Sequence, residues 1–317
     1  MVGNSPRVSI GLPVHNGEKY LEEALDSILA QTYKDFEIII SDNASNDKTQ
    51  DICLKYAQDD GRIKYHRNDK NLGAAPNHNL VFRMARGVYF KWFGYDDKIS
   101  PDFLFECVKI LDANPDVALC MPKTNLIDEH GQFIGELNYK ADAGSPAPHK
   151  RFGNFIFHNE AGDYVYGLMR VDKISQTSLH GSFPSSDLVF LAELTLYGKY
   201  YILPDRLFYR RFHSEQSTKG NFQVERSRVL WFDTSLKSKV VLPKWMYLFG
   251  YLRSVKNAPV NFFQKIYCYF QIFRWALIPP HFRALGKDVL LAARKIIVDL
   301  LSLLIIRNDD ADNVEKL

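Results

Sequence analysis

Residues 7–41 contain the pattern that decides the fold: "RVSIGLPV" (7–14), "GEKYLEEALDSILAQ" (17–31) and "FEIIIS" (36–41). The first and third pieces are short apolar runs, typical of strands that are covered on both faces. The middle piece has apolar residues at helical spacing, which predicts an amphipathic helix. A helix between two such strands indicates a parallel pair joined by a right-handed crossover.

The alternation of strand and helix continues to about residue 93. "SNDKTQDICLKYAQ" (45–58) is typical of a helix, and "RIKYH" (62–66) of a third strand. After a further loop and helix, "VYFKWF" (88–93) has the composition of a fourth strand. We therefore predict an α/β domain whose mainly parallel sheet is flanked by helices.

Composition narrows the class of protein. The 317 residues are 46% hydrophobic and 24% charged, which is typical of a globular chain with a sizeable core. A net charge of +3 is too small to indicate nucleic-acid binding. The four cysteines are far apart and lack a C-x-x-C pair, and the N-terminus has no apolar signal segment, so we expect reduced thiols and a cytoplasmic location.

Polar residues follow each of the four predicted strands. Parallel strands bind ligands at their carboxyl ends, so these residues should meet at one edge of the sheet. Taken singly they are also ordinary turn and cap residues. They are Pro13, His15, Asn16 and Glu18 after the first strand, Asp42, Asn43 and Ser45 after the second, Arg67 and Asn68 after the third, and Asp96 and Asp97 after the fourth.

The adjacent carboxylates Asp96 and Asp97 lie in "KWFGYDDKISPDF" (91–103), between an apolar run and a predicted helix. Burying two like charges is costly unless a cation or hydrogen bonds compensate. Carboxylate oxygens at a strand end suit Mg²⁺ or Mn²⁺, whereas the alternative is a solvated acidic loop. The helix is expected to have Ser100 as its cap and Pro101 at its first position.

Four segments together resemble the family 2 glycosyltransferases of the GT-A fold, over about residues 7–104. They are "PVHNGEKYLEEALDSILAQT", "SDNASNDKT", "NLGAAPNHN" and "GVYFKWFGYDD". The resemblance implies a GT-A (Rossmann-like) fold, a nucleotide-diphosphate-sugar donor, Mg²⁺ or Mn²⁺, and inversion at the anomeric carbon.

No G-x-G-x-x-G or G-x-x-x-x-G-K-[ST] motif follows a strand, which argues against dinucleotide oxidoreductases and P-loop enzymes.

The resemblance also assigns site residues. The first nucleotide-binding loop matches Pro13, Asn16 and Glu18, the base contact matches Asp42 with Asn43 beside it, and the loop under the nucleotide matches Asn71 and Gly73. Asp96 and Asp97 fall on the Asp-X-Asp motif as ligands of metal and donor. Gly94 stands where many members have the first aspartate, which makes a metal requirement less certain.

The second half of the chain should supply the catalytic base and the acceptor site. Asp187 matches the family's base position, although an acid in the first turn of a helix also complements the helix dipole. Glu193 is the reserve candidate. Arg211 and His213 resemble the distal motif that lies near phosphates and metal, and an ordinary surface loop is the competing interpretation.

We expect a catalytic domain over residues 1–217, with a nucleotide-sugar-binding half to about residue 104, and a helical, basic and apolar region over 218–317. Residues 131–163 are expected to form a flexible excursion over the acceptor side, or a simple surface connection. Polar residues interrupt the apolar run at 260–280, so a membrane span is not expected. Instead, 240–306 is predicted to touch a membrane surface, and a packed helical subdomain or a dimer contact are the alternatives.

The sequence thus predicts an inverting glycosyltransferase that uses a hydroxyl acceptor in the synthesis of a cell-surface polysaccharide or glycolipid, with a lipid-linked precursor as the candidate acceptor. The enzyme would lie at the inner face of the membrane, with a homo-oligomer as one candidate state. The alternatives are a catalytically degenerate protein of the same fold that binds a nucleotide sugar or a membrane partner and, less favoured, a nicotinamide enzyme.

Overall fold

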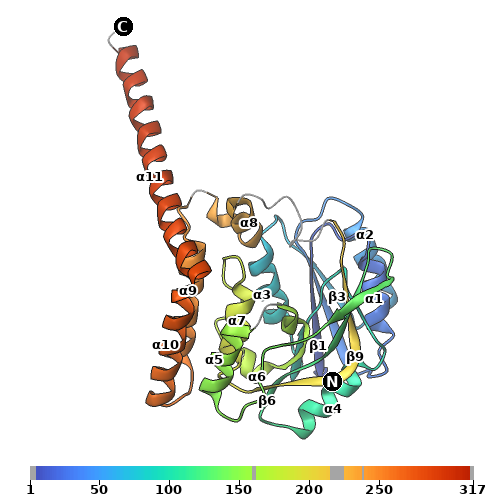
Figure 1. Cartoon of the computed structure of the whole chain (residues 1–317). Coiled ribbons are helices and arrows are strands. Elements are labelled where there is room, and N and C mark those ends of the chain that lie inside the picture. The colour runs from blue at the N-terminus through green and yellow to red at the C-terminus, as the bar shows by residue number, and fades with distance from the viewer. Residues whose placement is uncertain (1–4, 159–161, 215–224, 238, 315–317) are drawn as a thin grey trace.

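The computed structural model describes residues 5–158, 162–214, 225–237 and 239–314 of the chain. One mixed sheet is flanked by helices, and a helical C-terminal region runs along one side (Figure 1). Within the described residues the sheet has nine strands in the order β3-β2-β1-β4-β8-β6-β9-β5, and β7 pairs with β6 outside this path. This arrangement confirms the predicted α/β class.

The N-terminal half of the sheet is parallel. β1 lies between β2 and β4, and β3 pairs with β2. Every residue of β1, β2 and β4 is buried, which explains why these strands are almost continuously apolar. The elements are β1 (Val8–Val14), α1 (Leu21–Leu29), β2 (Phe36–Asp42), α2 (Thr49–Asp59), β3 (Ile63–Arg67), α3 (Ala74–Met84) and β4 (Tyr89–Trp92).

The second half of the sheet is mixed. β8 is antiparallel to both β4 and β6 and so joins the two halves, whereas β6 and β9 are long parallel neighbours. The elements are β5 (Lys98–Ile99), α4 (Phe103–Ala113), β6 (Val117–Ile127), β7 (Phe133–Leu137), α5 (Pro148–His158), η1 (Gly162–Tyr166), β8 (Leu168–Arg170), α6 (Val171–Ile174), α7 (Ser186–Leu194) and β9 (Lys199–Arg211).

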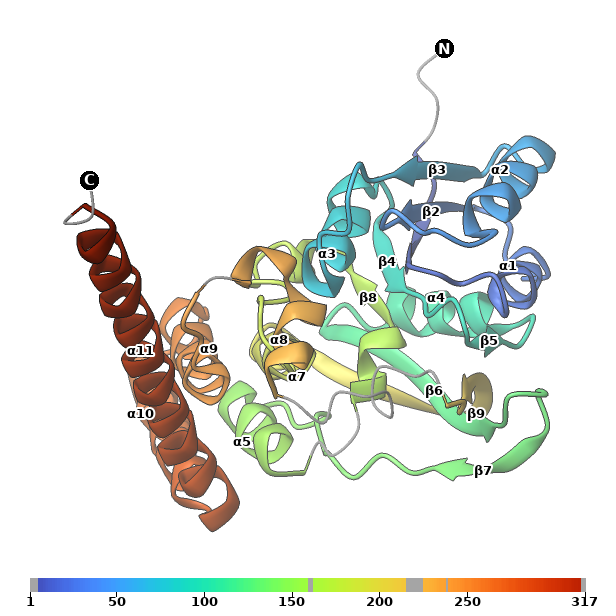
Figure 2. The same ribbon diagram turned by 90° about the horizontal axis from the view of Figure 1, so that it is seen from above.

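The C-terminal region consists of helices. They are α8 (Glu225–Phe232), η2 (Thr234–Leu236), α9 (Pro243–Asn257), α10 (Phe262–Leu277) and α11 (Pro279–Val314). α9 packs on α7, and α10 packs on α5. Figure 2 shows α10 and α11 along the side of the molecule opposite β3. Within the part of the chain described here, none of the helices combines the length and the apolar character that crossing a bilayer requires.

Two local predictions are wrong. α4 begins at Phe103, so Pro101 is not its first residue, and Ser100 contributes a backbone carbonyl to the turn instead of a side-chain cap. The segment 131–163 is not an irregular excursion, because it contains β7 and α5. Phe152, Phe155 and Ile156 of α5 recur at helical spacing and are buried, so a helical pattern was present within this polar segment. The predicted boundary at 217/218 lies outside the described residues.

Candidate active site

A cleft of about 270 Å³ lies at the carboxyl ends of the parallel strands. β1, β2 and β4 end there, and their loops form its floor, as expected for an open parallel sheet. The described lining residues are Pro13, Val14, His15, Asn43, Asn71, Ala74, Asn77, His78, Phe93, Gly94, Tyr95, Asp96, Asp97, Tyr166, Arg210, Leu230, Trp231 and Thr234.

The loops after β1 and β2 are tied together by hydrogen bonds. The Asn16 side chain accepts from the Asn46 amide at 3.0 Å, and the Asn16 amide donates to Ser45 Oγ at 2.9 Å. Glu18 accepts from the Lys48 amide at 2.9 Å. Asn16 has a positive φ of 54°, a conformation that asparagine tolerates better than most residues. Asn16 and Glu18 therefore shape the rim of the cleft without lining it.

Asp42 is fully buried, and its carboxylate is occupied by protein groups. Oδ1 accepts from the Ser45 amide at 2.8 Å, and Oδ2 accepts from the hydroxyl of Tyr65 at 2.8 Å and from the guanidinium of Arg67 at 2.5 Å. Its neighbour Asn43 lies in the cleft lining. In this arrangement Asp42 holds the end of β2 in place, and Asn43, whose side chain is bonded to Asn68, Asn71, Leu72 and Gly73, holds the cleft wall beside it.

A network of amide groups connects the second loop to the loop before α3. Asn43 Nδ2 donates to Asn71 Oδ1 at 2.9 Å, and Asn43 Oδ1 accepts from the Leu72 amide at 2.9 Å. Asn71 Oδ1 also accepts from the Gly73 amide at 2.8 Å. Gly73 has a φ of 93°, which favours glycine strongly. Asn43, Asn71 and Gly73, which were predicted as site residues, are thus connected in one hydrogen-bond network.

The C-terminal region closes one wall of the cleft. Leu230 and Trp231 at the end of α8 and Thr234 in η2 belong to the lining. Thr234 Oγ1 donates to the Asn71 carbonyl at 2.9 Å. A Cβ at Gly73 would lie 2.7 Å from the Phe232 carbonyl oxygen, so the absence of a side chain permits this close approach.

The acidic pair turns toward the space above Gly94. A Cβ at position 94 would lie 2.7 Å from Asp97 Oδ2 and 3.0 Å from Asp96 Oδ1. Asp97 is buried, and its Oδ1 accepts from the Arg211 amide at 3.0 Å. Burial raises the pKa of Asp97 well above its usual range, and the charge of Asp96 raises it further. A nearby cation would relieve both effects.

Arg211 and His213 contact Asp96 and Asp97 without lining the cleft. The buried Arg211 guanidinium donates to the Asp96 carbonyl at 2.8 Å and pairs with Glu23. His213 Nε2 lies 2.9 Å from Asp96 Oδ2, whereas its buried Nδ1 has no hydrogen-bond partner among the described residues. Neither side chain belongs to the cleft lining.

The acidic pair fits a divalent cation that takes its other ligands from elsewhere. The described residues contain no group of three or more His, Cys, Asp or Glu arranged to hold a metal. Mg²⁺ and Mn²⁺ need few protein carboxylates when substrate phosphates complete the coordination. Two carboxylates at the cleft, one of them buried beside a like charge, are a donor set of that kind.

Arg210, and not Arg211, is the arginine of β9 that lines the cleft. Successive side chains of a strand point to opposite faces, so the two arginines are directed differently. Arg210 pairs with the buried Asp163 beside the lining residue Tyr166. The alternation of β9 was a signal for Arg210, and His78 lies within the segment "NLGAAPNHN", whereas no sequence pattern pointed to Tyr166 or Trp231.

The two candidate bases lie outside the described cleft lining. Asp187 is in the first turn of α7, partly exposed, near Tyr247 and Tyr251, whose pKa values are raised mainly by burial and further by its charge. Glu193 is buried, and its Oε2 accepts from the Ser178 amide at 2.9 Å. Burial raises the pKa of Glu193. Of the two, only Asp187 is accessible to solvent.

Residues 9–166, about half of the chain, match the model of glycosyl transferase family 2. The chain belongs to glycosyltransferase family 2. An uncharacterized glycosyltransferase of Methanocaldococcus jannaschii is 38% identical over 140 residues, which cover 43% of this chain and 48% of that protein. The putative glycosyltransferase EpsH of Bacillus subtilis is 33% identical over 117 residues, 37% of this chain and 33% of EpsH. The matches thus span less than half of these relatives.

Solved structures with similar folds cover most of this family 2 glycosyltransferase. TarS (residues 1–349) of S. aureus in complex with UDP-GlcNAc has a TM-score of 0.63 at 17% identity, over 89% of this chain and 80% of that chain. The mannosyltransferase PcManGT of Pyrobaculum calidifontis, in complex with GDP-Man and Mn²⁺, has a TM-score of 0.50 at 14% identity, over 94% and 88%. These likenesses confirm the GT-A type of fold.

Proposed function

We propose that this protein is an inverting glycosyltransferase that transfers a sugar from a nucleotide-diphosphate-sugar to a hydroxyl group. The observation that carries the proposal is the pairing of Asp96 and Asp97 at a cleft that the Asn43 and Asn71 amide network also lines, within a family 2 domain. Groups that bind a nucleotide and groups that bind a charged diphosphate are thus available in one cleft.

The donor would lie across the carboxyl ends of β1, β2 and β4. Pro13, Asn43 and Asn71 line the side where the nucleoside would bind. Asn16, Glu18, Asp42 and Gly73 would hold the loops that carry them, through the hydrogen bonds described above. Nucleotide sugars in the similar structures of TarS and PcManGT support a donor of this class.

Asp96 and Asp97, with His213 positioned against Asp96, would hold Mg²⁺ or Mn²⁺. The ion would neutralise charge on the departing diphosphate. Arg211 would fix the backbone and orientation of the pair through the Asp96 carbonyl and Asp97 Oδ1. Arg210 is the cationic side chain of β9 at the cleft itself, where it can face a phosphate.

Asp187 is the proposed base. It would take the proton of the acceptor hydroxyl while that oxygen attacks the anomeric carbon and the bond from carbon to the diphosphate oxygen breaks. Burial alone would raise the pKa of Asp233, the residue before η2, but Ser182 in the loop before α7 and Ser235 help to lower it. The start of α7 would thus lie near the wall that carries Trp231 and Thr234.

The acceptor is proposed to be a lipid-linked or surface-polysaccharide precursor, handled at the inner face of a membrane. Residues 1–217 would form the catalytic domain, with acceptor-binding groups after about residue 104. α9, α10 and α11 lie along one side of the fold, outside this domain, whereas α8 and η2 add residues to the cleft (Figure 1). Self-association is a further proposal, which the oligomeric state of the protein in solution tests.

Release of nucleotide from a panel of nucleotide-diphosphate-sugars tests the proposal. We expect Mn²⁺-dependent release from at least one donor, abolished by a chelator and by Asp96→Asn. Asp187→Asn should leave donor affinity unchanged and lower transfer to an acceptor by about 100-fold or more. Glu193→Gln is the matched control and should retain transfer if its fold is intact. Donor binding without release under any condition would favour the degenerate binding protein instead.

A further inference from the structure

Helix α10 has two opposite apolar faces. Cys268, Ile272 and Trp275 are buried against the rest of the fold. The other face is exposed to solvent, with side chains between 50% and 79% exposed. These side chains are Phe262, Phe263, Ile266, Phe270, Phe273 and Leu277. Residues at this spacing share one side of a helix, so six large apolar side chains form a continuous surface.

The first part of α11, which packs against α10, carries exposed apolar residues of its own. Phe282, Val289, Leu290 and Ile297 are between 49% and 72% exposed and also recur at helical spacing. In both views α10 and α11 lie on the outer side of the molecule, away from the sheet (Figures 1 and 2). A soluble monomer rarely exposes so large an apolar patch, so another apolar phase or molecule is expected to cover it.

The charges around this surface are almost all positive. Between residues 256 and 297 the basic residues are Lys256, Lys265, Arg274, Arg283, Lys287, Arg294 and Lys295. The only acid in that range is Asp288, which is 2% exposed. Aromatic and aliphatic residues on one face with Lys and Arg beside them are typical of helices that lie in the interface of an anionic membrane.

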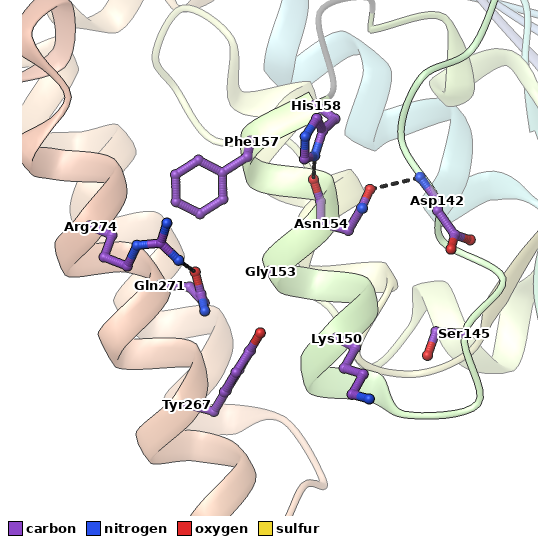
Figure 3. Close-up of a pocket in the computed structure, with 10 residues that line it drawn as sticks. All are labelled: Asp142, Ser145, Lys150, Gly153, Asn154, Phe157, His158, Tyr267, Gln271 and Arg274. Atoms are coloured by element: carbon purple, nitrogen blue, oxygen red, sulfur yellow. Dashed lines mark hydrogen bonds between the residues drawn. The ribbon is translucent and has the colours of Figure 1, made fainter.

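A cavity of about 530 Å³ lies beside the exposed face, between α5 and α10. Figure 3 shows Lys150 and His158 of α5 on one side of it and Arg274 of α10 on the other. Arg274 donates to Gln271 Oε1 at 3.1 Å, and its guanidinium lies 5.4 Å from the centre of the Phe157 ring. The acid at the cavity, Asp142, accepts from the Gly144 amide at 2.9 Å.

The position of Arg274 connects the cavity to the apolar face. Arg274 follows Phe270 by four residues and precedes Leu277 by three, so it borders their face, on the side of the lining residues Tyr267 and Gln271. A lipid whose chains contact the phenylalanines would therefore have its phosphate near Arg274, whereas Lys150 lies on the far side of the cavity (Figure 3). Ser145 and Asn154 in the lining can provide further hydrogen bonds.

We propose that α10 and the first part of α11 dock on an anionic lipid surface, and that the cavity between α5 and α10 receives the phosphate of one lipid headgroup. The apolar face supplies affinity for any bilayer, and the cationic groups supply selectivity for anionic lipid. Because docking needs no nucleotide sugar, it can be measured separately from the transfer reaction.

Co-sedimentation of the full chain with lipid vesicles tests the apolar face. The wild-type protein should bind vesicles of phosphatidylcholine and phosphatidylglycerol, and Phe270→Glu should lower this binding about tenfold or more. Phe133→Glu on β7 is the matched control, because Phe133 is exposed to a similar degree on another part of the fold. The control should bind vesicles as the wild type does.

The cavity is tested by the charge dependence of binding. Arg274→Gln should lower binding to vesicles that contain phosphatidylglycerol about fivefold and leave the weaker binding to phosphatidylcholine vesicles unchanged. Lys34→Gln, an exposed charge on the loop after α1, is the control for net charge. Equal losses for Arg274→Gln and Lys34→Gln would overturn the headgroup site.

The oligomeric state without lipid completes the test. A wild-type monomer that binds anionic vesicles, with a Phe270→Glu variant of unchanged melting temperature that does not, supports the proposal. A wild-type dimer that ignores vesicles and becomes monomeric in Phe270→Glu would overturn it, because the surface would then be covered by a second copy. Nucleotide release, measured on the same samples, reports separately on the proposed transfer activity.

Discussion

Gly94 and Asp42 contribute to this cleft in different ways: Gly94 leaves space for two carboxylates, and Asp42 holds the end of β2 in place. Gly94 was interpreted from the sequence as a missing acid, yet in the structure it leaves the space into which Asp96 and Asp97 turn. Asp42 was expected to contact the nucleotide base, and in the structure its buried carboxylate accepts hydrogen bonds from Ser45, Tyr65 and Arg67. A motif identifies which loop matters, but the hydrogen bonds of each atom depend on residues that are distant in the sequence.

Gly94→Ala should weaken binding of the donor with Mn²⁺ by about tenfold or more, because the new methyl group would displace the carboxylates that hold the ion. Isothermal titration of the donor measures the change. Gly61→Ala is the control, since a Cβ at Gly61 meets nothing within 4 Å. Unchanged donor affinity in Gly94→Ala would contradict the role given to this space.

Lys91 on β4 gives the molecule a pH-dependent stability. It is fully buried and donates to the Tyr166 carbonyl, and burial lowers its pKa to about 7. A lysine in the unfolded chain keeps its proton to roughly pH 10. Between these values folding releases a proton, so this residue makes the folded state more stable as the pH rises.

Lys91→Met should remove that contribution. The unfolding free energy of the wild type minus that of the variant should increase from pH 7 to pH 9. The increase should be at most about 1.4 kcal/mol per pH unit. Urea unfolding at several pH values measures it. If this difference stays constant or decreases as the pH rises, Lys91 remains charged in the folded protein.

At the scale of elements, the parallel half of the sheet could be predicted and the rest only in part. β1, β2 and β4 are buried on both faces, so their apolar runs are unambiguous. α5 and the short β8 were not predicted, because α5 buries Arg151 and Gly153 together with its apolar residues, and β8 is three residues whose pairing is set by the strands around it. Pairing between distant segments leaves no local pattern.

The contact between η2 and the loop before α3 is also invisible in the sequence. Gly73→Ala should destabilise the protein by about 2 kcal/mol or more, because alanine is strained at its positive φ and would collide with the Phe232 carbonyl. Donor binding should weaken as the wall of the cleft moves. Chemical denaturation and donor titration measure the two effects.

Gly131→Ala is the matched control for that variant. Gly131 also has a positive φ, 79°, but a Cβ there would meet only Arg211 Nη1 at 3.7 Å. The Gly131→Ala variant should lose only the roughly 1–2 kcal/mol that a positive φ costs alanine, and its donor affinity should be unchanged. If both variants lose equal stability and keep donor affinity, the wall formed by η2 does not contribute to the site.

At the scale of the whole molecule, the C-terminal region serves both the cleft and the outer surface. α8 and η2 add Leu230, Trp231 and Thr234 to the cleft, beyond the part of the chain that matches the family model. α10 and α11 carry the exposed apolar face on the opposite side of that region. Composition alone predicted a change of character after about residue 217, but not that the same region completes the cleft.

Trp231→Ala should lower donor affinity without unfolding the protein. Trp231 is partly exposed and lines the cleft. Its removal should therefore reduce contact with the ligand more than it reduces packing within the protein. We expect a roughly tenfold loss in donor titration with an unchanged melting temperature. Trp245→Ala, on α9 away from the cleft lining, should keep donor affinity. A Trp231→Ala variant that binds the donor normally would remove α8 from the site.

A crystal structure of this chain with a nucleotide-diphosphate-sugar and Mn²⁺ tests the central claim most directly. The account predicts the ion between the diphosphate and the carboxylates of Asp96 and Asp97, and the nucleoside against Pro13, Asn43 and Asn71. Donor bound elsewhere, with no ion or phosphate beside Asp96 and Asp97, would contradict it.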